Sequence, residues 1–187
     1  NKALVPQRNR ATELGLKYQA GGVSMGAVAY QNDIQGFIIP ATNVQSALGV
    51  LRGLTLSADL QSGSSSYAVS YDYADPRSYA TSPASNDLRL VRIARHVFNA
   101  RVNHRMGQAA LFGEIKVSGD REDNNLAFTG RDILPGYTVL NLGLNYQLQK
   151  SVSVLARLNN ATDEKYVLAN TYSTPGRNVF VSLNWAL

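Results

Sequence analysis

The sequence contains no cysteine. A disulfide-stabilised scaffold, a zinc site with cysteine ligands and a thiol nucleophile are therefore excluded. An extracytoplasmic location remains compatible with this composition, because an oxidising compartment permits disulfides without requiring them.

Long apolar runs are also lacking. A membrane-spanning helix needs about 18 or more consecutive apolar residues, and the sequence has no such stretch. Residues 1–10 do not have the apolar core of a secretory signal peptide. The mean hydropathy of −0.17 is typical of soluble proteins, but a membrane β-barrel reaches the same value because only half of each strand is apolar.

The excess of positive charge is small and dispersed. Lys and Arg total 18 and Asp and Glu total 13, for a net charge of +5. The arginines are spread from Arg8 to Arg177, whereas nucleic-acid binders gather basic residues on one face or helix. We therefore expect no nucleic-acid partner.

What the sequence does contain is alternation with a period of two, the pattern of a half-buried β-strand. Residues 139–148 place Leu140, Leu142, Leu144, Tyr146 and Leu148 on one face and Asn141, Gly143, Asn145 and Gln147 on the other. Similar runs recur along the chain, and no segment shows a convincing helical stripe. The sequence predicts an all-β protein with nine candidate strands, two of them less regular, over residues 23–33 and 88–104.

The predicted connections alternate in length. Short links are expected around residues 21–22, 62–66, 105–107 and 149–151, and long ones at 32–43, 75–87, 119–136 and 159–177. Outer-membrane barrels have short periplasmic turns and long extracellular loops. Strands of about 10 residues also suit a tilted crossing of the bilayer. The pattern favours an antiparallel transmembrane β-barrel whose long links face outward.

A soluble β-sandwich would also alternate apolar and polar residues. Two features favour the membrane. The polar face is small and rich in amides, which suits a wet lumen, and aromatic residues lie near strand ends as in the girdles of barrels: Tyr18, Tyr73, Tyr146 and Trp185. Because a membrane sheet must close and single-chain bacterial barrels usually have even strand numbers, we expect nine strands to be part of a longer barrel.

Several segments resemble motifs of TonB-dependent receptors, in order along the whole chain. Residues 158–166 (LNNATDEKY) look like the family's NLFDKDY segment, and residues 172–177 (YSTPGR) resemble the Y-x-TPGR element before its last strand. Residues 5–15, 30–34 and 52–54 resemble further family motifs. Within the family, residues 69–77 (VSYDYADPR) and 90–94 look most like the vitamin B12 (cobalamin) receptor branch.

The resemblance implies that residues 1–187 are the C-terminal portion of a receptor barrel, about nine strands of roughly 22, without the N-terminal plug. It implies the bacterial outer membrane, with lipid and lipopolysaccharide around the barrel, insertion by the barrel assembly machinery, and TonB acting through the plug. The implied function is uptake of cobalamin or another corrinoid. A ferric-siderophore receptor is the alternative, and a small standalone structural or adhesive barrel is a further one.

Two residues match ligand contacts of the cobalamin branch. Tyr172 matches a ligand-contacting tyrosine, although it could equally be a girdle tyrosine at the membrane interface. Arg92 matches a wall arginine near the ligand, although it could instead be a lumen arginine paired with a carboxylate. The chain departs from the family at Leu187, where phenylalanine is usual, and in residues 120–132, which lack the tyrosines of cobalamin receptors.

The other titratable groups point to no metal site. His96 and His104 are expected on one strand, roughly 26 Å apart, which is too far to share an ion. Asp120, Glu122 and Asp123 supply too few oxygen ligands for calcium and are predicted to lie in a solvated loop. No cofactor is expected.

We do not expect an enzyme, because no catalytic constellation is recognisable. An outer-membrane hydrolase would need a serine and a histidine at the outer rim. His96 and His104 are expected instead toward the middle and the periplasmic end of their strand.

Overall fold

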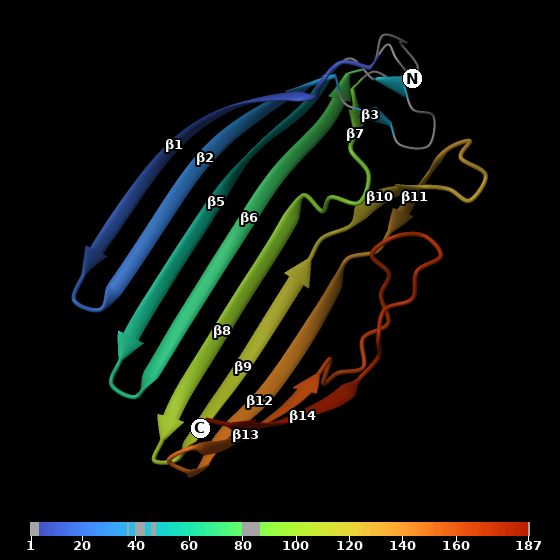
Figure 1. The fold of residues 1–187 in the computed structure, drawn as a ribbon. Coiled ribbons are helices and arrows are strands. Elements are labelled where there is room, and N and C mark those ends of the chain that lie inside the picture. Colours follow the sequence, from blue (N-terminus) through green and yellow to red (C-terminus); the bar gives the residue numbers. More distant parts are fainter. Residues whose placement is uncertain (1–3, 37, 40–43, 46–47, 80–86, 187) are drawn as a thin grey trace.

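A computed structural model describes residues 4–36, 38–39, 44–45, 48–79 and 87–186. Nine long strands follow one another in a single antiparallel sheet (Figure 1). They are β1 (Arg8–Ala20), β2 (Val23–Gln35), β5 (Leu48–Ser62), β6 (Ser65–Tyr79), β8 (His96–Met106), β9 (Ala109–Ser118), β12 (Tyr137–Gln149), β13 (Val152–Asn159) and β14 (Asn178–Trp185). The prediction of an all-β chain is confirmed. In the described part of the chain, no helix is long and apolar enough to cross a membrane.

Four two-residue turns, at 21–22, 63–64, 107–108 and 150–151, lie at one end of the sheet, close to the predicted short links (Figure 1). The described parts of the long connections lie at the other end. The links predicted at 32–43 and 75–87 begin later than expected, because β2 continues to Gln35 and β6 to Tyr79, and residues 40–43 and 80–86 lie outside the described residues. Gly21 and Gly22 have φ of 56° and 81°. Turns with positive φ at both central residues match the right-handed twist of the strands they join, and glycine adopts such φ values without steric cost.

Several short strands lie at the end of the sheet that carries the long connections. They are β3 (Ile38–Ile39) with β4 (Val44–Gln45), β7 (Leu88–Arg89) on β6, and the hairpin of β10 (Arg121–Asn124) with β11 (Arg131–Leu134). The predicted polar loop at 119–136 is therefore largely a hairpin.

The prediction of one strand over residues 88–104 is wrong. Arg92 has a φ of 66°, a left-handed conformation that no extended strand can contain. Its N–H donates to Glu122 O instead of a sheet partner, so the long strand begins only at His96. The sequence predicted that His96 lies toward the middle of its strand. His96 is instead the first residue of β8, at the end of the sheet with the long connections.

The strand register sorts the side chains into two chemically different faces. One row across β5, β6, β8 and β9 is apolar: Leu56, Tyr71, Phe98 and Val117. The next residues along the same strands form a row on the other face that is polar: Ser57, Ser70, Asn99 and Lys116. A one-residue slip would exchange these faces on every strand.

The apolar face has no second layer over it among the described residues. Its side chains stay exposed, including Leu14, Leu16, Leu142 and Leu183. The buried hydrophobic side chains are few: Val50, Leu134, Tyr137 and Val139. An exposed apolar surface of this extent is unusual for a soluble monomer, and it fits a sheet whose apolar face contacts lipid.

Within the described part of the chain, the sheet is open. The path of strand pairing begins at β1 and ends at β14, and these two strands do not pair with each other. Each therefore has an edge of backbone N–H and C=O groups without a strand partner, which a hydrocarbon environment does not tolerate.

Arginine substitutions on the two faces test the membrane assignment. Leu142→Arg places a charge on the apolar face, and we expect it to lower the free energy of unfolding by about 2–4 kcal/mol if the site lies near the bilayer midplane. Asn145→Arg, three residues nearer the turn at 150–151 and on the polar face, should cost much less. Unfolding of the full-length protein in lipid vesicles measures both, and equal costs would argue for a soluble sheet.

Cysteine labelling tests which end of the sheet faces outward. These 187 residues contain no cysteine. Leu126→Cys between β10 and β11 and Ser64→Cys in a tight turn are therefore unique labelling sites once any cysteine elsewhere in the receptor is replaced by serine. A membrane-impermeant maleimide on intact cells should label the first and not the second. The opposite pattern would invert the topology.

Candidate functional site in the outer loop cluster

The two family-like motifs near the end of the chain fold against each other. Asn160 is 3% exposed and has a φ of 48°, a conformation that asparagine tolerates better than most residues. Its side-chain oxygen accepts the N–H of Glu164 at 2.8 Å and its amide donates to Glu164 O at 2.9 Å. The chain therefore turns sharply as it leaves β13.

Asp163 joins the first motif to the second. Its Oδ1 accepts the backbone N–H of Arg177 at 2.8 Å and the ammonium of Lys165 at 3.1 Å. The Arg177 N–H first, and then Lys165, lower the pKa of Asp163. A Cβ on Gly176 would lie 2.7 Å from the same oxygen, so the close approach of the two motifs requires a glycine at this position.

Stacked rings support the base of this loop. The rings of Tyr137 and Tyr166 stack with centroids 4.1 Å apart, and the Arg121 guanidinium lies 4.9 Å from the Tyr137 ring centroid. Beside them is a hollow of about 410 Å³, lined by Pro135, Gly136, Lys165, Tyr166, Val167, Ser173 and Thr174. The 160–177 loop thus rests on the start of β12.

A buried carboxylate ties this loop to the β10–β11 hairpin. Asp123 is 0% exposed, and it accepts hydrogen bonds from the N–H of Asn170 at 2.7 Å, the N–H of Asn124 at 2.8 Å and Nε of Arg92 at 3.0 Å. Desolvation favours its neutral form, but these three donors outweigh that effect and hold the pKa of Asp123 below its ordinary value.

The structure brings the two predicted ligand residues to this cluster. Arg92 pairs directly with Asp123 while its side chain stays 54% exposed. It lies in the connection before β8, at the end of the sheet with the long connections. Tyr172 is 69% exposed and follows Asn170 by two residues. The pairing of Arg92 with a carboxylate matches the alternative interpretation of that residue, and its exposed surface leaves a ligand contact open.

The acidic residues of the β10 region are each paired with an arginine. Asp120 contacts Arg89 at 3.1 Å and Glu122 contacts Arg131 at 4.0 Å. The prediction that these acids lie in a solvated loop is wrong for Asp123, because the 160–177 loop covers it. Within the described residues, no group of three or more His, Asp or Glu side chains is arranged to hold a metal ion.

The two histidines have separate partners at opposite ends of β8. Nδ1 of His96 lies 2.8 Å from the hydroxyl of Tyr71, and Nδ1 of His104 lies 2.8 Å from Oγ of Ser65. Their separation along β8 agrees with the prediction that they cannot share an ion.

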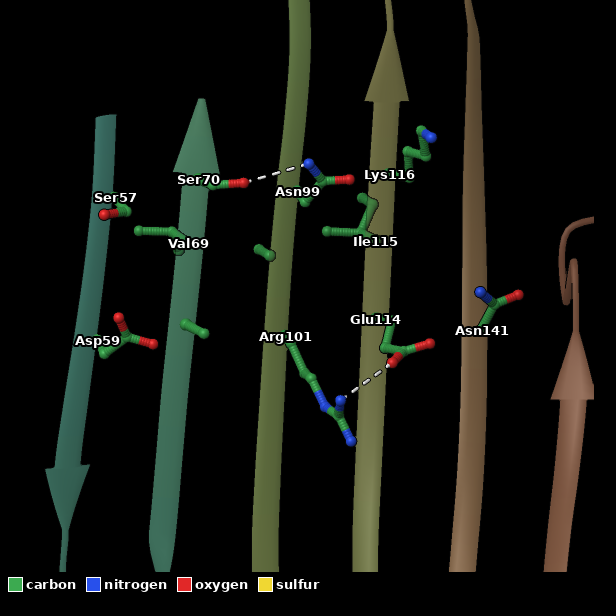
Figure 2. Close-up of a pocket in the computed structure, with 12 residues that line it drawn as sticks. Ser57, Asp59, Val69, Ser70, Asn99, Arg101, Glu114, Ile115, Lys116 and Asn141 are labelled. Carbon is green, nitrogen blue, oxygen red and sulfur yellow. Dashed lines mark hydrogen bonds and ion pairs between the residues drawn. The ribbon is translucent and has the colours of Figure 1, made fainter. Parts of the chain in front are cut away.

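A second cluster lies on the polar face. Glu114 accepts a hydrogen bond from Arg157 at 2.6 Å and lies 3.6 Å from Arg101, and both guanidinium groups are 5.6 Å from the Phe112 ring centroid. Figure 2 shows Arg101 and Glu114 directed toward each other from neighbouring strands. They line a shallow hollow of about 430 Å³ together with Asp59, Asn99, Lys116 and Asn141.

Sequence reasoning missed Asn170 and the role of Asp123. These residues are 47 positions apart, and neither stands in a periodic pattern. The one available signal was the mixture of acids and arginines around residue 121, which indicates paired charges but not their partners.

Comparisons with known proteins agree on one family. A family model described as "TonB dependent receptor-like, beta-barrel" matches residues 1–161. The vitamin B12 transporter BtuB of Vibrio vulnificus (strain YJ016) is 26% identical over 200 residues, which cover 99% of this chain and 31% of that protein. The chain thus spans about a third of the length of this relative.

Solved structures share the fold at lower identity. The FrpB iron transporter from Neisseria meningitidis (F5-1 variant) has a TM-score of 0.81 at 17% identity, covering 98% of this chain and 32% of its own. The siderophore receptor PirA from Acinetobacter baumannii has a TM-score of 0.81 at 15% identity, covering 99% and 32%. The copper transporter OprC has a TM-score of 0.79 at 19% identity, covering 100% and 32%.

A substitution at Gly176 tests the packing of the two motifs. Gly176→Ala places a methyl group against the Asp163 carboxylate, which hydrogen bonds from Arg177 and Lys165 hold in place. We expect this substitution to lower the free energy of unfolding by about 1–3 kcal/mol, as overpacking does. Gly119→Ala is the matched control, because its nearest atom would be 3.4 Å away. Denaturant titration of both variants measures the difference, and equal stabilities would contradict the packing argument.

Proposed function

The chain belongs to the family of TonB-dependent receptor β-barrels, and on that basis we propose that residues 1–187 form the C-terminal part of the barrel of an outer-membrane nutrient receptor. Proteins of this family reside in the outer membrane. The share of the relatives that the chain spans and the open edges of β1 and β14 support its being part of a larger barrel. The N-terminal plug then belongs to another part of the receptor.

The two faces of the sheet fit this role. The apolar face would contact outer-membrane lipid and lipopolysaccharide, and the polar face would line the lumen around the plug. TonB would act through the plug, and the barrel assembly machinery would insert the wall. The paired charges around Glu114 fit a lumen, where a carboxylate and two guanidinium groups remain hydrated.

We propose cobalamin or a related corrinoid as the transported nutrient. The observation that carries this proposal is the 26% identity with a vitamin B12 transporter over 99% of the chain. A ferric siderophore is the second candidate, because solved siderophore and iron transporters share the fold. Their identity of 15–17% supports the fold and carries less weight for the ligand.

The proposed ligand contact is the loop cluster around Asp123, which includes Arg92 and Tyr172. Tyr172 offers an exposed ring and one hydroxyl, which suit a large, flat and partly apolar ligand. Arg92 keeps about half of its side chain exposed beside Asp123, so it has donors available for peripheral amides. Loops held by a rigid sheet are common positions for binding residues.

Tyrosine substitutions in the full-length receptor test this proposal. Tyr172→Ala should weaken cobalamin binding by about 1–3 kcal/mol, on the scale of an aromatic hot spot. Tyr172→Phe separates the ring from the hydroxyl and should retain most of the affinity. Expression should be unchanged in both, because an exposed tyrosine contributes little to folding.

Equilibrium binding of cyanocobalamin and of a ferric siderophore measures the outcome. A receptor that ignores cobalamin and binds the siderophore would reject the cobalamin assignment and leave the family unaffected. Unchanged cobalamin affinity in Tyr172→Ala would remove Tyr172 from the site.

A further inference from the structure

One carboxylate connects the two residues assigned to the ligand. Asp123 binds Arg92 through Oδ1 and the N–H of Asn170 through Oδ2, and Asn170 is two residues before Tyr172. The two oxygens of one buried side chain therefore hold two loops that are far apart in the sequence.

The backbone next to both contacts is strained. Thr171, between Asn170 and Tyr172, has a φ of 72°, and Arg92 has a φ of 66°. Positive φ is unfavourable for a β-branched residue such as threonine. Such conformations are costly and persist only where surrounding contacts hold them.

The β10–β11 hairpin supplies those contacts. Besides donating its N–H to Asp123, Asn170 donates its side-chain amide to Asn124 O at 2.6 Å and to Oδ2 of Asp132 at 3.0 Å. Glu122 O, in the same strand β10, accepts the N–H of Arg92 at 2.7 Å. Among the described residues, the hydrogen bonds that join residues 169–172 to the hairpin are those of Asn170.

We propose that Asp123 is a positioning residue that sets the geometry of the ligand site by locking Arg92 and the Tyr172 turn onto the β10–β11 hairpin. This inference rests on the proposed function for its ligand. Without the carboxylate, the N–H of Asn170 and the Arg92 guanidinium lose a shared acceptor, and unsatisfied donors favour opening of the turn to water. Tyr172 then no longer lies at a fixed distance from Arg92.

Hydrogen exchange in the full-length receptor tests the lock without any ligand. Asp123→Asn removes the charge and one acceptor at nearly constant shape, and amide exchange in residues 168–173 should become at least about tenfold faster, which corresponds to 1.4 kcal/mol of opening free energy. Glu122→Gln is the matched control, because it removes a neighbouring charge and keeps the backbone contact to Arg92. Unchanged exchange in Asp123→Asn would overturn the proposal.

A second pair of variants guards against misfolding. Asn170→Ala removes the side-chain contacts to the hairpin from the opposite loop and should also speed exchange, whereas Asp123→Glu should restore part of the protection. If Asp123→Asn does not reach the outer membrane, Asp123→Glu decides, because its longer side chain displaces the two oxygens that hold the Asn170 N–H and Arg92. Faster exchange than in the wild type then supports the lock, and unchanged exchange overturns it.

Cyanocobalamin binding then tests positioning. Asp123→Asn should weaken binding by about tenfold or more, and this loss should shrink in a Tyr172→Ala background because the two residues act through the same turn. Additive losses would show that Asp123 does not act through Tyr172. A wild-type receptor without cobalamin affinity would reject the proposed ligand, and the exchange data would still decide whether the lock exists.

Discussion

Pairing of backbone hydrogen-bonding groups between neighbouring strands is the constraint on which the rest of this structure depends. A hydrocarbon environment supplies no donors or acceptors, so each long strand must be fully paired over the length that crosses it. The thickness of that environment sets the length of the strands, and the tight turns together with the apolar–polar pattern fix their register. The register in turn decides that Leu56 and Phe98 share one face while Ser57 and Asn99 share the other.

The regular part of the fold could be predicted from the sequence because it follows from local alternation. The alternation of apolar and polar residues indicates a strand whatever lies beside it, as in Leu142 and Leu144 alternating with Asn141 and Asn145. The prediction of one strand over residues 88–104 was wrong because Arg92 has a left-handed backbone conformation, which separates β7 from β8. Alternation contains no information about a positive φ at an arginine.

The candidate site was only partly accessible to such reasoning. Family-like motifs pointed to Arg92 and Tyr172, but their common partner, Asp123, comes from a hairpin that the sequence presented as a polar loop. Contacts between distant loops depend on tertiary packing, and a buried aspartate has no periodic signature. The motif around Asn160 and Gly176, by contrast, has a local physical reason: one residue tolerates the positive φ and the other leaves room for a carboxylate.

The open edges of the sheet bear on how such a wall can form. Consecutive strands such as β5 and β6 meet through tight turns, so their pairing closes short loops quickly. β1 and β14 instead require partners other than these nine strands. Joining distant strands closes a much longer loop, whose larger entropy cost slows the step. Hairpins would thus form early and ring closure last, which leaves the two unpaired edges open to non-native strand pairing for most of assembly.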